Sequence, residues 1–300
     1  MRILLTGAAG WFGAFALESL IERGHEVVAW SGRTQGERRF QDRSIVLEPI
    51  DLGHPDQERL VRRLDQVDPE AILHTAAIAS ADAAFRDPDQ AQRVNVQATE
   101  TLGLWCALRR RRLIFTSTDL VFGGSGPPRR ETDPAQPSLT YGRTKLEAER
   151  RLAQVNPEAL SVRLSLMYGL TRSDRLSFFD QVLADLAQGR PRALFIDEYR
   201  TPAHAPTVAR LLVEWLESPT FPSGLVHVGG PDRLSRFDLV RQAAACLGLD
   251  PQLVQPSRMI DTRFNEPRPA DVALDTTRLH ALNPRHRPQT VSQELTSRKS

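Results

Sequence analysis

The sequence predicts an α/β protein with a doubly wound parallel sheet, followed by a smaller α+β region. Two observations predict this architecture. Segments typical of strands and helices alternate through the first half of the chain, and the strand segments are short continuous apolar runs. Such runs are typical of parallel strands buried on both faces, and the alternation implies right-handed crossovers. We therefore place one domain at 1–166 and a second region at 167–300, partly folded back on the first.

The individual elements follow from local hydrophobic patterns. Strands are predicted at 3–5, 26–30, 45–47, 71–75, 113–116 and 160–164, and helices at 11–23, 55–66, 89–111 and 141–153. The long helix 89–111 carries its apolar residues on one face, at Val94, Ala98, Leu102 and Trp105. Beyond residue 167 the alternation is weaker, with helices at 174–188, 208–217 and 236–247 and a strand at 225–228.

Three glycines, Gly7, Gly10 and Gly13, join the first strand to the first helix. Gly7 can supply the dihedrals of a tight turn, Gly10 lets the main chain approach a pyrophosphate, and Gly13 lets the helix lie close to the strand. The free N–H groups at the helix start, from Trp11 and Phe12 on, then face the phosphates. An ordinary glycine turn is the alternative. The position between a first strand and a first helix favours a dinucleotide-binding site of the Rossmann type.

Composition excludes several classes of function. An apolar fraction of 40% and a charged fraction of 25% are typical of a soluble globular chain, and a net charge of +2 gives no strong attraction to nucleic acid or membranes. The run of four arginines at 109–112 ends a predicted helix. Cations at a helix end interact favourably with the helix dipole and with solvent, and we favour this role over nucleic-acid binding. No apolar run is long enough to span a membrane, and the chain start is too short for a signal peptide, so we expect a cytoplasmic protein.

Neither the cysteines nor the histidines indicate a metal site. Cys106 and Cys246 both lie in apolar helical patterns and resemble small buried hydrophobic residues, not a disulfide framework. The seven histidines show no close spacing typical of metal ligands. We predict no bound metal.

Tyr141 and Lys145 form the pattern Y-x-x-x-K at a helix start. Residues four apart lie on one helix face, and a lysine ammonium near a phenol lowers the phenol's pKa from about 10 towards neutrality. Tyr141 is therefore a candidate general acid for a carbonyl oxygen. A surface pair is the alternative for an isolated motif, but this one follows the fifth strand of a chain that opens with the glycine pattern.

Hydroxyl side chains end the fifth strand. Thr116, Ser117 and Thr118 come at the carboxyl end of a buried strand, where doubly wound sheets place their ligands. Thr118 can hydrogen-bond the substrate oxygen beside Tyr141. The alternative is that these hydroxyls cap the strand, and we expect that role for at least one of the three.

The end of the second strand bears on cofactor choice. NAD-specific sites place an acidic residue there to hold the ribose 2′-hydroxyl, and no carboxylate stands at 30–33. Ser31 can donate a hydrogen bond to a 2′-phosphate, and Arg33 can offer a charged fork. We predict NADP, with NAD also possible if Arg33 is only a solvated loop residue.

Taken together, the motifs resemble those of the extended short-chain dehydrogenase/reductases and, among them, the dTDP-4-dehydrorhamnose reductases. The matching segments are 6–13, 51–52, 74–77, 94–96, 117–122, 131–134, 141–145 and 162–169, with further likeness at 201–206 and 268–275. The likeness spans most of the chain. It implies an oxidoreductase that reduces a keto group of a nucleotide-linked sugar, as in dTDP-rhamnose biosynthesis.

The resemblance implies roles for individual residues. Thr118, Tyr141 and Lys145 match the catalytic triad, and Asn95 matches an asparagine that supports the lysine through water. The implied cofactor contacts are Gly7, Gly10, Trp11, Phe12, Gly13, Ser31, Arg33, Asp51, Leu52, Ala76, Ala77, Tyr141 and Lys145, with Asp51 and Leu52 at the adenine.

Departures from the family pattern leave the sugar open. Leu120 stands where the family often has tyrosine, Leu166 where it often has tryptophan, and the segment 78–82 also differs. An epimerase or dehydratase of the same scaffold is one alternative, although Leu120 after Asp119 replaces the glutamate of the dehydratases. A non-catalytic subunit similar to the regulatory partner of methionine adenosyltransferase is another. Whether the chain forms a homodimer stays open.

Overall fold

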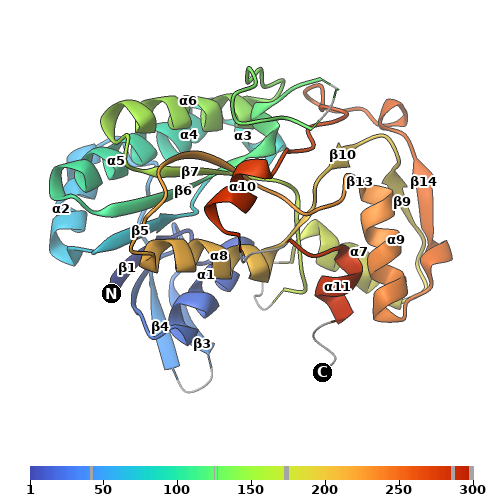
Figure 1. Cartoon of the computed structure of the whole chain (residues 1–300), viewed down its shortest axis with the longest axis horizontal. Coiled ribbons are helices and arrows are strands. Elements are labelled where there is room, and N and C mark those ends of the chain that lie inside the picture. Colours follow the sequence, from blue (N-terminus) through green and yellow to red (C-terminus); the bar gives the residue numbers. More distant parts are fainter. Residues whose placement is uncertain (41–42, 125, 127, 172–175, 285–287, 297–300) are drawn as a thin grey trace.

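The computed structural model describes residues 1–40, 43–124, 126, 128–171, 176–284 and 288–296. Its central sheet has the strand order β12-β7-β6-β5-β1-β2-β4-β3 (Figure 1). The strands are β1 (Arg2–Thr6), β2 (Glu26–Trp30), β3 (Gly36–Phe40), β4 (Arg43–Glu48), β5 (Ala71–His74), β6 (Arg112–Thr118), β7 (Leu160–Leu164) and β12 (Gly224–Val228). All neighbouring pairs are parallel except β3 and β4, so the predicted doubly wound sheet is confirmed.

Strand β3 was not predicted from the sequence. It pairs antiparallel with β4, with Gly36 opposite Leu47, and forms one edge of the sheet. Its sequence, Gly-Glu-Arg-Arg-Phe, has no alternation of apolar and polar residues. An edge strand needs little apolar surface, so local hydrophobic patterns do not reveal it.

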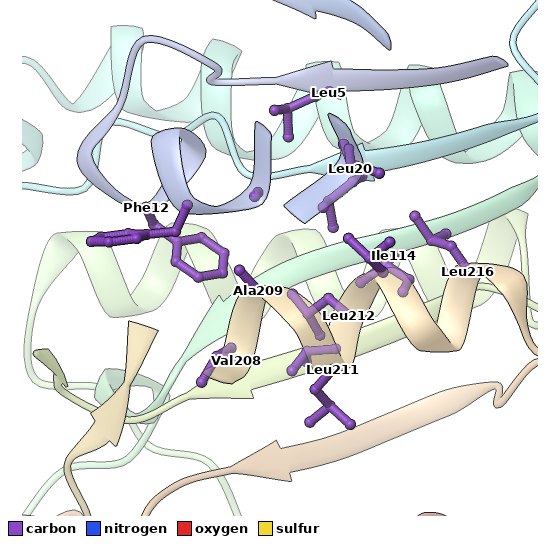
Figure 2. Close-up of a cluster of buried hydrophobic side chains, with 14 of the residues drawn as sticks. Leu5, Phe12, Leu20, Ile114, Val208, Ala209, Leu211, Leu212 and Leu216 are labelled. Carbon is purple, nitrogen blue, oxygen red and sulfur yellow. The ribbon is translucent and has the colours of Figure 1, made fainter. Parts of the chain in front are cut away.

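Helices cover both faces of the sheet (Figure 1). Helices α1 (Trp11–Glu22) and α8 (Ala205–Glu217) share one hydrophobic core with the sheet, and helices α2 (Gln57–Val67), α5 (Ala98–Arg109) and α6 (Thr140–Val155) share the other. Figure 2 shows Leu20 of α1 and Leu212 of α8 in the first of these cores, together with Leu5 of β1. Because α8 covers α1, the latter is apolar around most of its circumference.

The long helix predicted at 89–111 contains an irregular turn. Helix α4 (Pro88–Gln92) and α5 are joined by a π-helical turn, η1, at Arg93–Gln97. The four predicted apolar positions are all buried, so the predicted face is correct. A π-helical turn holds one residue more than an α-helical turn, and π-turns are frequent at functional sites. Here the turn contains Asn95. A short helix that was not predicted, α3, lies at Ala81–Arg86.

A third core, smaller than the two that flank the sheet, lies in the C-terminal half of the chain. It is formed by helices α7 (Phe178–Ala187), α9 (Arg236–Leu247) and α11 (Val291–Thr296) and by the parallel pair β9 (Arg192–Phe195) and β14 (Val254–Ser257). The remaining elements are β8 (Met167–Tyr168), β10 (Tyr199–Arg200), β11 (Ala203–His204), β13 (Leu234–Ser235), α10 (Thr277–Leu282) and the short turns η2 (Asp119–Val121), η3 (Pro251–Leu253) and η4 (Met259–Asp261). We call the part built on this third core, together with β10 and β13, the C-terminal lobe.

Several elements from beyond residue 166 belong to the central sheet layer instead. Strand β12 pairs with β7, and α8 packs on α1. Helix α7 begins at Phe178 because Ser177 and Asp180 form a capping box. The start of the helix predicted at 174–188 lies outside the described residues, which omit 172–175.

The arginine run at the end of α5 is bound to the protein itself. Arg109 pairs with Asp65, Arg111 pairs with Asp68 at 3.0 Å, and Arg112 donates to the carbonyl of Leu216. Within the described residues, none of the helices combines the length and hydrophobicity that crossing a membrane requires.

Candidate active site

The glycine turn after β1 has the backbone that its sequence predicts. Gly7 has φ +74°, a left-handed conformation that favours glycine. A Cβ atom on Gly13 would lie 2.0 Å from the carbonyl oxygen of Gly7, so only glycine lets α1 approach the turn this closely. No side chain in the described part of the chain caps the start of α1, and the first turn of α1 contains no acidic residue. This helix start is therefore suited to bind an anion.

A cavity of about 1180 Å³ begins at this turn and continues past the carboxyl ends of the parallel strands. The chain reverses direction across the sheet between β1 and β5, the place where doubly wound sheets bind ligands. The predicted residues that line the cavity are Gly7, Gly10, Trp11, Phe12, Gly13, Ser31, Arg33, Asp51, Leu52, Ala76, Ala77, Thr118, Tyr141 and Lys145. Residues that are far apart in sequence are thus brought to one site, whose volume exceeds the usual range for a single small ligand.

At the end of β2, the two residues predicted to bind a 2′-phosphate differ in their contacts. Arg33 is exposed beside the cavity. The Ser31 hydroxyl instead donates towards the carbonyl oxygens of Thr34 and Glu48, the latter at 3.0 Å. Donation by Ser31 to a 2′-phosphate stays a prediction, and in this conformation the hydroxyl is directed to backbone carbonyls. Arg38, on the unpredicted strand β3, also lines the cavity and donates to the carbonyl of Ala9 at 3.2 Å.

The two aromatic residues at the start of α1 have different contacts. Trp11 donates its indole N–H to Asp180 of α7 at 3.1 Å, so the glycine turn is tied to the C-terminal lobe. Phe12 lines the cavity on one side and packs into the core on the other (Figure 2).

The candidate proton donor, Tyr141, lies at the start of α6 and lines the cavity. Burial and the charge of Asp119 raise the pKa of Tyr141, and a hydrogen bond with Thr118 opposes the increase. This differs from the sequence-based expectation that Lys145 lowers the pKa of Tyr141. The reason is that Lys145 is itself buried: burial lowers its pKa from 10.5 to about 7, although the charge of Glu149 opposes this. The Lys145 ammonium lies 4.0 Å from the centre of the Phe115 ring.

Three hydroxyls end strand β6, and their partners differ. Thr116 donates to the carbonyl of His74 at 3.1 Å, and Ser117 donates to Glu149, which also binds Arg163. Thr118 donates to Asp119 at 3.2 Å and accepts the N–H of Leu120 at 3.2 Å. Thr118 is thus the hydroxyl that remains close to Tyr141.

Asn95 is fully buried in the π-helical turn. Its amide oxygen accepts the N–H of Ile78 at 2.8 Å, and its amide nitrogen donates to Thr144 at 2.9 Å. Thr144 precedes Lys145 on α6. Asn95 therefore joins the segment after β5 to the helix that carries the Tyr141 and Lys145 pair.

A buried network that sequence reasoning missed lies behind the cavity. The ring of His74 bonds Thr6 through Nδ1 at 2.7 Å and Thr99 through Nε2 at 3.0 Å, while Thr99 donates to the carbonyl of Asn95. Because Thr99 uses its only proton on that carbonyl, His74 must donate from Nε2 and accept at Nδ1. Burial and the nearby Lys145 lower the pKa of His74 to about 3, so the ring is neutral. The sequence motif at 74–77 gave the position of this residue but not its role.

This chain is similar to known proteins over almost its whole length. Residues 1–296 match the family described as the RmlD substrate binding domain. The probable low-salt glycan biosynthesis reductase Agl14 of Haloferax volcanii is 33% identical over 280 residues, which cover 92% of this chain and 90% of that protein. Methionine adenosyltransferase 2 subunit beta of Xenopus laevis is 27% identical over 292 residues, covering 94% of this chain and 82% of that protein.

Solved structures with the same fold include two reductases. The dTDP-4-dehydrorhamnose reductase of Yersinia enterocolitica superposes with a TM-score of 0.82 at 22% identity, over 99% of this chain and 98% of that chain. The dTDP-4-dehydrorhamnose reductase of Bacillus anthracis, solved in complex with NADP, has a TM-score of 0.81 at 19% identity, over 99% of this chain and 97% of that chain.

Proposed function

Because this chain belongs to the RmlD substrate binding domain family, we propose that it is an NADPH-dependent reductase of a keto group on a nucleotide-linked sugar. The observation that carries the proposal is the single cavity in which the glycine turn, Thr118, Tyr141 and Lys145 meet. The dTDP-4-dehydrorhamnose reductases are the relatives whose chemistry fits this arrangement best.

The residues present fit a dinucleotide. The uncapped start of α1 and the left-handed Gly7 form an anion cradle, and Arg33 lies near the end of β2 where a 2′-phosphate would be read. Asp51, Leu52, Ala76 and Ala77 line the cavity between these points. When bound, NADPH supplies the hydride for the keto carbon. The protein residues then have to hold the sugar oxygen and deliver a proton to it.

Tyr141 delivers that proton. Its pKa is raised by burial and by Asp119, so Tyr141 is protonated at neutral pH, the form that a proton donor requires. After donation the phenolate is stabilised by a hydrogen bond from Thr118 and by the protonated form of Lys145. Because Lys145 has a pKa of about 7, it changes protonation in the working pH range and can pass a proton back to Tyr141.

The alternatives fit the site less well. A dehydratase needs an acid and a base that face the sugar, but Asp119 is buried against Arg200 and Ser165, and Leu120 follows it. An epimerase of this scaffold needs the same tyrosine and stays a second candidate, separated from a reductase by whether cofactor is consumed. A non-catalytic subunit, as the methionine adenosyltransferase relative suggests, has no need of Thr118, Tyr141 and Lys145 around one cavity.

The experiment is NADPH oxidation with nucleotide-linked 4-keto sugars, comparing the parent with Tyr141→Phe. We expect the variant to lose turnover by about 100-fold or more while it keeps its affinity for NADPH, because only the proton donor is removed. The matched control is Tyr168→Phe, since Tyr168 is buried against Phe179 and His204 away from the cavity lining. Tyr141→Phe turnover within a few-fold of the parent would refute the assignment.

A further inference from the structure

A buried carboxylate, that of Asp119, lies directly behind the catalytic hydroxyl, and the mechanism described so far does not use its contact with that hydroxyl. Asp119 is 4% exposed and is not among the described residues that line the cavity, although its neighbours Thr118 and Ser165 are. One carboxylate oxygen accepts the Thr118 hydroxyl at 3.2 Å. The other accepts the Ser165 hydroxyl at 3.2 Å and lies 3.5 Å from Nε of Arg200.

These contacts determine which way the Thr118 hydroxyl points. A hydroxyl has one proton, and Thr118 directs it to Asp119 while it accepts the N–H of Leu120. In this state Thr118 presents a lone pair, not a proton, towards the cavity. Once Tyr141 has given up its proton, the Thr118 hydroxyl can turn from Asp119 to the phenolate, which is the stronger acceptor within reach.

Asp119 is in turn held by the C-terminal lobe. Arg200, on β10, is 3% exposed and lies between two acids: Nη2 lies 3.0 Å from Glu198, and Nε faces Asp119. Glu198 also binds Arg236 on α9. Opposite charges thus alternate from the side of Thr118 into the C-terminal lobe. An ionised carboxylate is stable at this depth only if it is paired, and Arg200 is the cation that faces it.

From this geometry we propose that Asp119 is the positioning residue for Thr118, and that Arg200 holds Asp119 ionised from the C-terminal lobe. The inference rests on the proposed reductase function, in which Thr118 and Tyr141 act on the sugar oxygen. The ionised Asp119 has a second effect. Its charge favours protonated Tyr141, so one carboxylate both orients the threonine and keeps the proton donor loaded.

The charged and titratable groups around Asp119 are few. Burial raises the pKa of Asp119 above its usual value, and the charge of the more distant Glu198 adds to the increase. Arg200 opposes this increase, and so do the hydrogen bonds that Thr118 and Ser165 donate; Tyr141 faces Asp119 from α6. Removal of the Asp119 charge therefore acts mainly on Tyr141. Removal of the Arg200 charge acts on Asp119 first and on Tyr141 through it.

The test compares Asp119→Asn, Arg200→Met and Arg200→Lys by the pH profile of kcat. We expect Asp119→Asn to lower kcat about tenfold and to move the alkaline limb, where Tyr141 loses its proton, about one pH unit or more towards neutrality. Arg200→Met should move the same limb, whereas Arg200→Lys should keep much of the parent profile. The affinity for NADPH should stay within about twofold in all three variants, because neither Asp119 nor Arg200 lines the cavity. The control is Asp271→Asn, which removes another buried aspartate that pairs with an arginine, the exposed Arg233, and should leave the limb in place.

A second measurement does not depend on activity. Tyr141 is one of three tyrosines, so the difference in phenolate absorbance between each chain and its Tyr141→Phe derivative isolates its titration. The Tyr141 midpoint should fall in Asp119→Asn. An unchanged midpoint together with an unchanged kcat profile would overturn the positioning role while leaving the reductase assignment intact. Conversely, a parent that oxidises no NADPH with any keto-sugar would remove the reductase assignment, and the absorbance titration would still decide whether Asp119 controls Tyr141. Should Asp119→Asn fail to fold, Arg200→Lys and Arg200→Met provide the same comparison.

Discussion

At the level of single residues, cofactor choice depends on the side chains around the end of β2. Arg33 is exposed at the cavity, Ser31 is occupied by backbone carbonyls, and the segment from Trp30 to Arg33 contains no carboxylate. We therefore expect Arg33, rather than Ser31, to bind a 2′-phosphate. Arg38 has a different role, since it holds the glycine turn through the carbonyl of Ala9.

We expect Arg33→Ala to raise KM for NADPH about tenfold, because a hydrogen bond to a charged group is worth roughly 1.5–3 kcal/mol. KM for NADH should hardly change, since NADH has no 2′-phosphate. Initial rates with both cofactors measure the effect. Arg38→Ala is the comparison and should weaken both cofactors alike. If Arg33→Ala also weakened both alike, Arg33 would not be the phosphate reader.

Lys145 gives a prediction about stability. Its pKa is about 7 in the folded protein and near 10.5 when unfolded, so between these values only the unfolded chain binds the proton. The folded state is therefore penalised fully below pH 7 and progressively less as the pH rises to 10.5. Relative to Lys145→Met, the parent should be less stable at pH 6, and this deficit should shrink by up to about 1.4 kcal/mol per pH unit above pH 7. Urea unfolding at several pH values measures it; a deficit that does not vary with pH would contradict the lowered pKa.

At the level of elements, the glycine turn and α1 act as a unit. Gly13 is needed for packing, since its Cβ would lie 2.0 Å from the Gly7 carbonyl oxygen, whereas a Cβ on Gly10 would lie 3.0 Å from the same atom. We therefore expect Gly13 to be required for the stability of the fold and Gly10 for the binding of the cofactor. Each glycine of the motif thus relieves a different steric restriction.

Gly13→Ala should destabilise the protein by about 1–3 kcal/mol, as overpacking does, because the backbone of the turn has to shift. Gly10→Ala should cost less stability but reduce affinity for NADPH, because its methyl group occupies the space of the pyrophosphate. Denaturant unfolding and calorimetry of cofactor binding measure the two quantities on both variants. Equal stability losses, or an undiminished NADPH affinity of Gly10→Ala, would show that the assignment of the two roles is wrong.

For the whole molecule, the central sheet layer and the C-terminal lobe do not divide the chain at one point. Residues before 167 form most of the central sheet, yet β12 pairs with β7 and α8 covers α1 from beyond that point. The ion pair between Arg200 and Asp119 and the hydrogen bond from Trp11 to Asp180 then link the C-terminal lobe to the end of β6 and to the glycine turn. A cut near residue 166 would therefore expose an apolar helix face and a bare strand edge.

We accordingly expect a fragment of residues 1–166 to lack a stable native fold, whereas the full chain unfolds as one cooperative unit. The fragment would bind hydrophobic dyes and show little near-ultraviolet circular dichroism, since the apolar surface that α8 covers has no other partner. Adding residues 167–228 to the fragment, which restores α8 and β12, is the control and should recover more tertiary signal. A folded, dye-free 1–166 fragment would show that the central sheet is independent of these later elements.

Structural features that depend on the local pattern of apolar and polar residues could be predicted from the sequence. The strands at 26–30 and 160–164 and the helix at 236–247 have the predicted bounds, because their apolar periodicity is strong and their flanking residues end them. The sequence also predicts the glycine turn and the candidate residues Thr118, Tyr141 and Lys145, because each belongs to a short sequence motif.

Only the tertiary structure decided the features that depend on distant partners. The polar strand β3 exists because β4 pairs with it, and β12 belongs to the central sheet because β7 offers an edge. The π-helical turn at Asn95, the neutral ring of His74 and the ion pair between Asp119 and Arg200 are equally invisible in sequence. Charge and protonation followed the same rule: the pattern Tyr141-x-x-x-Lys145 predicts a lowered tyrosine pKa, but burial, which only the folded chain sets, raises it.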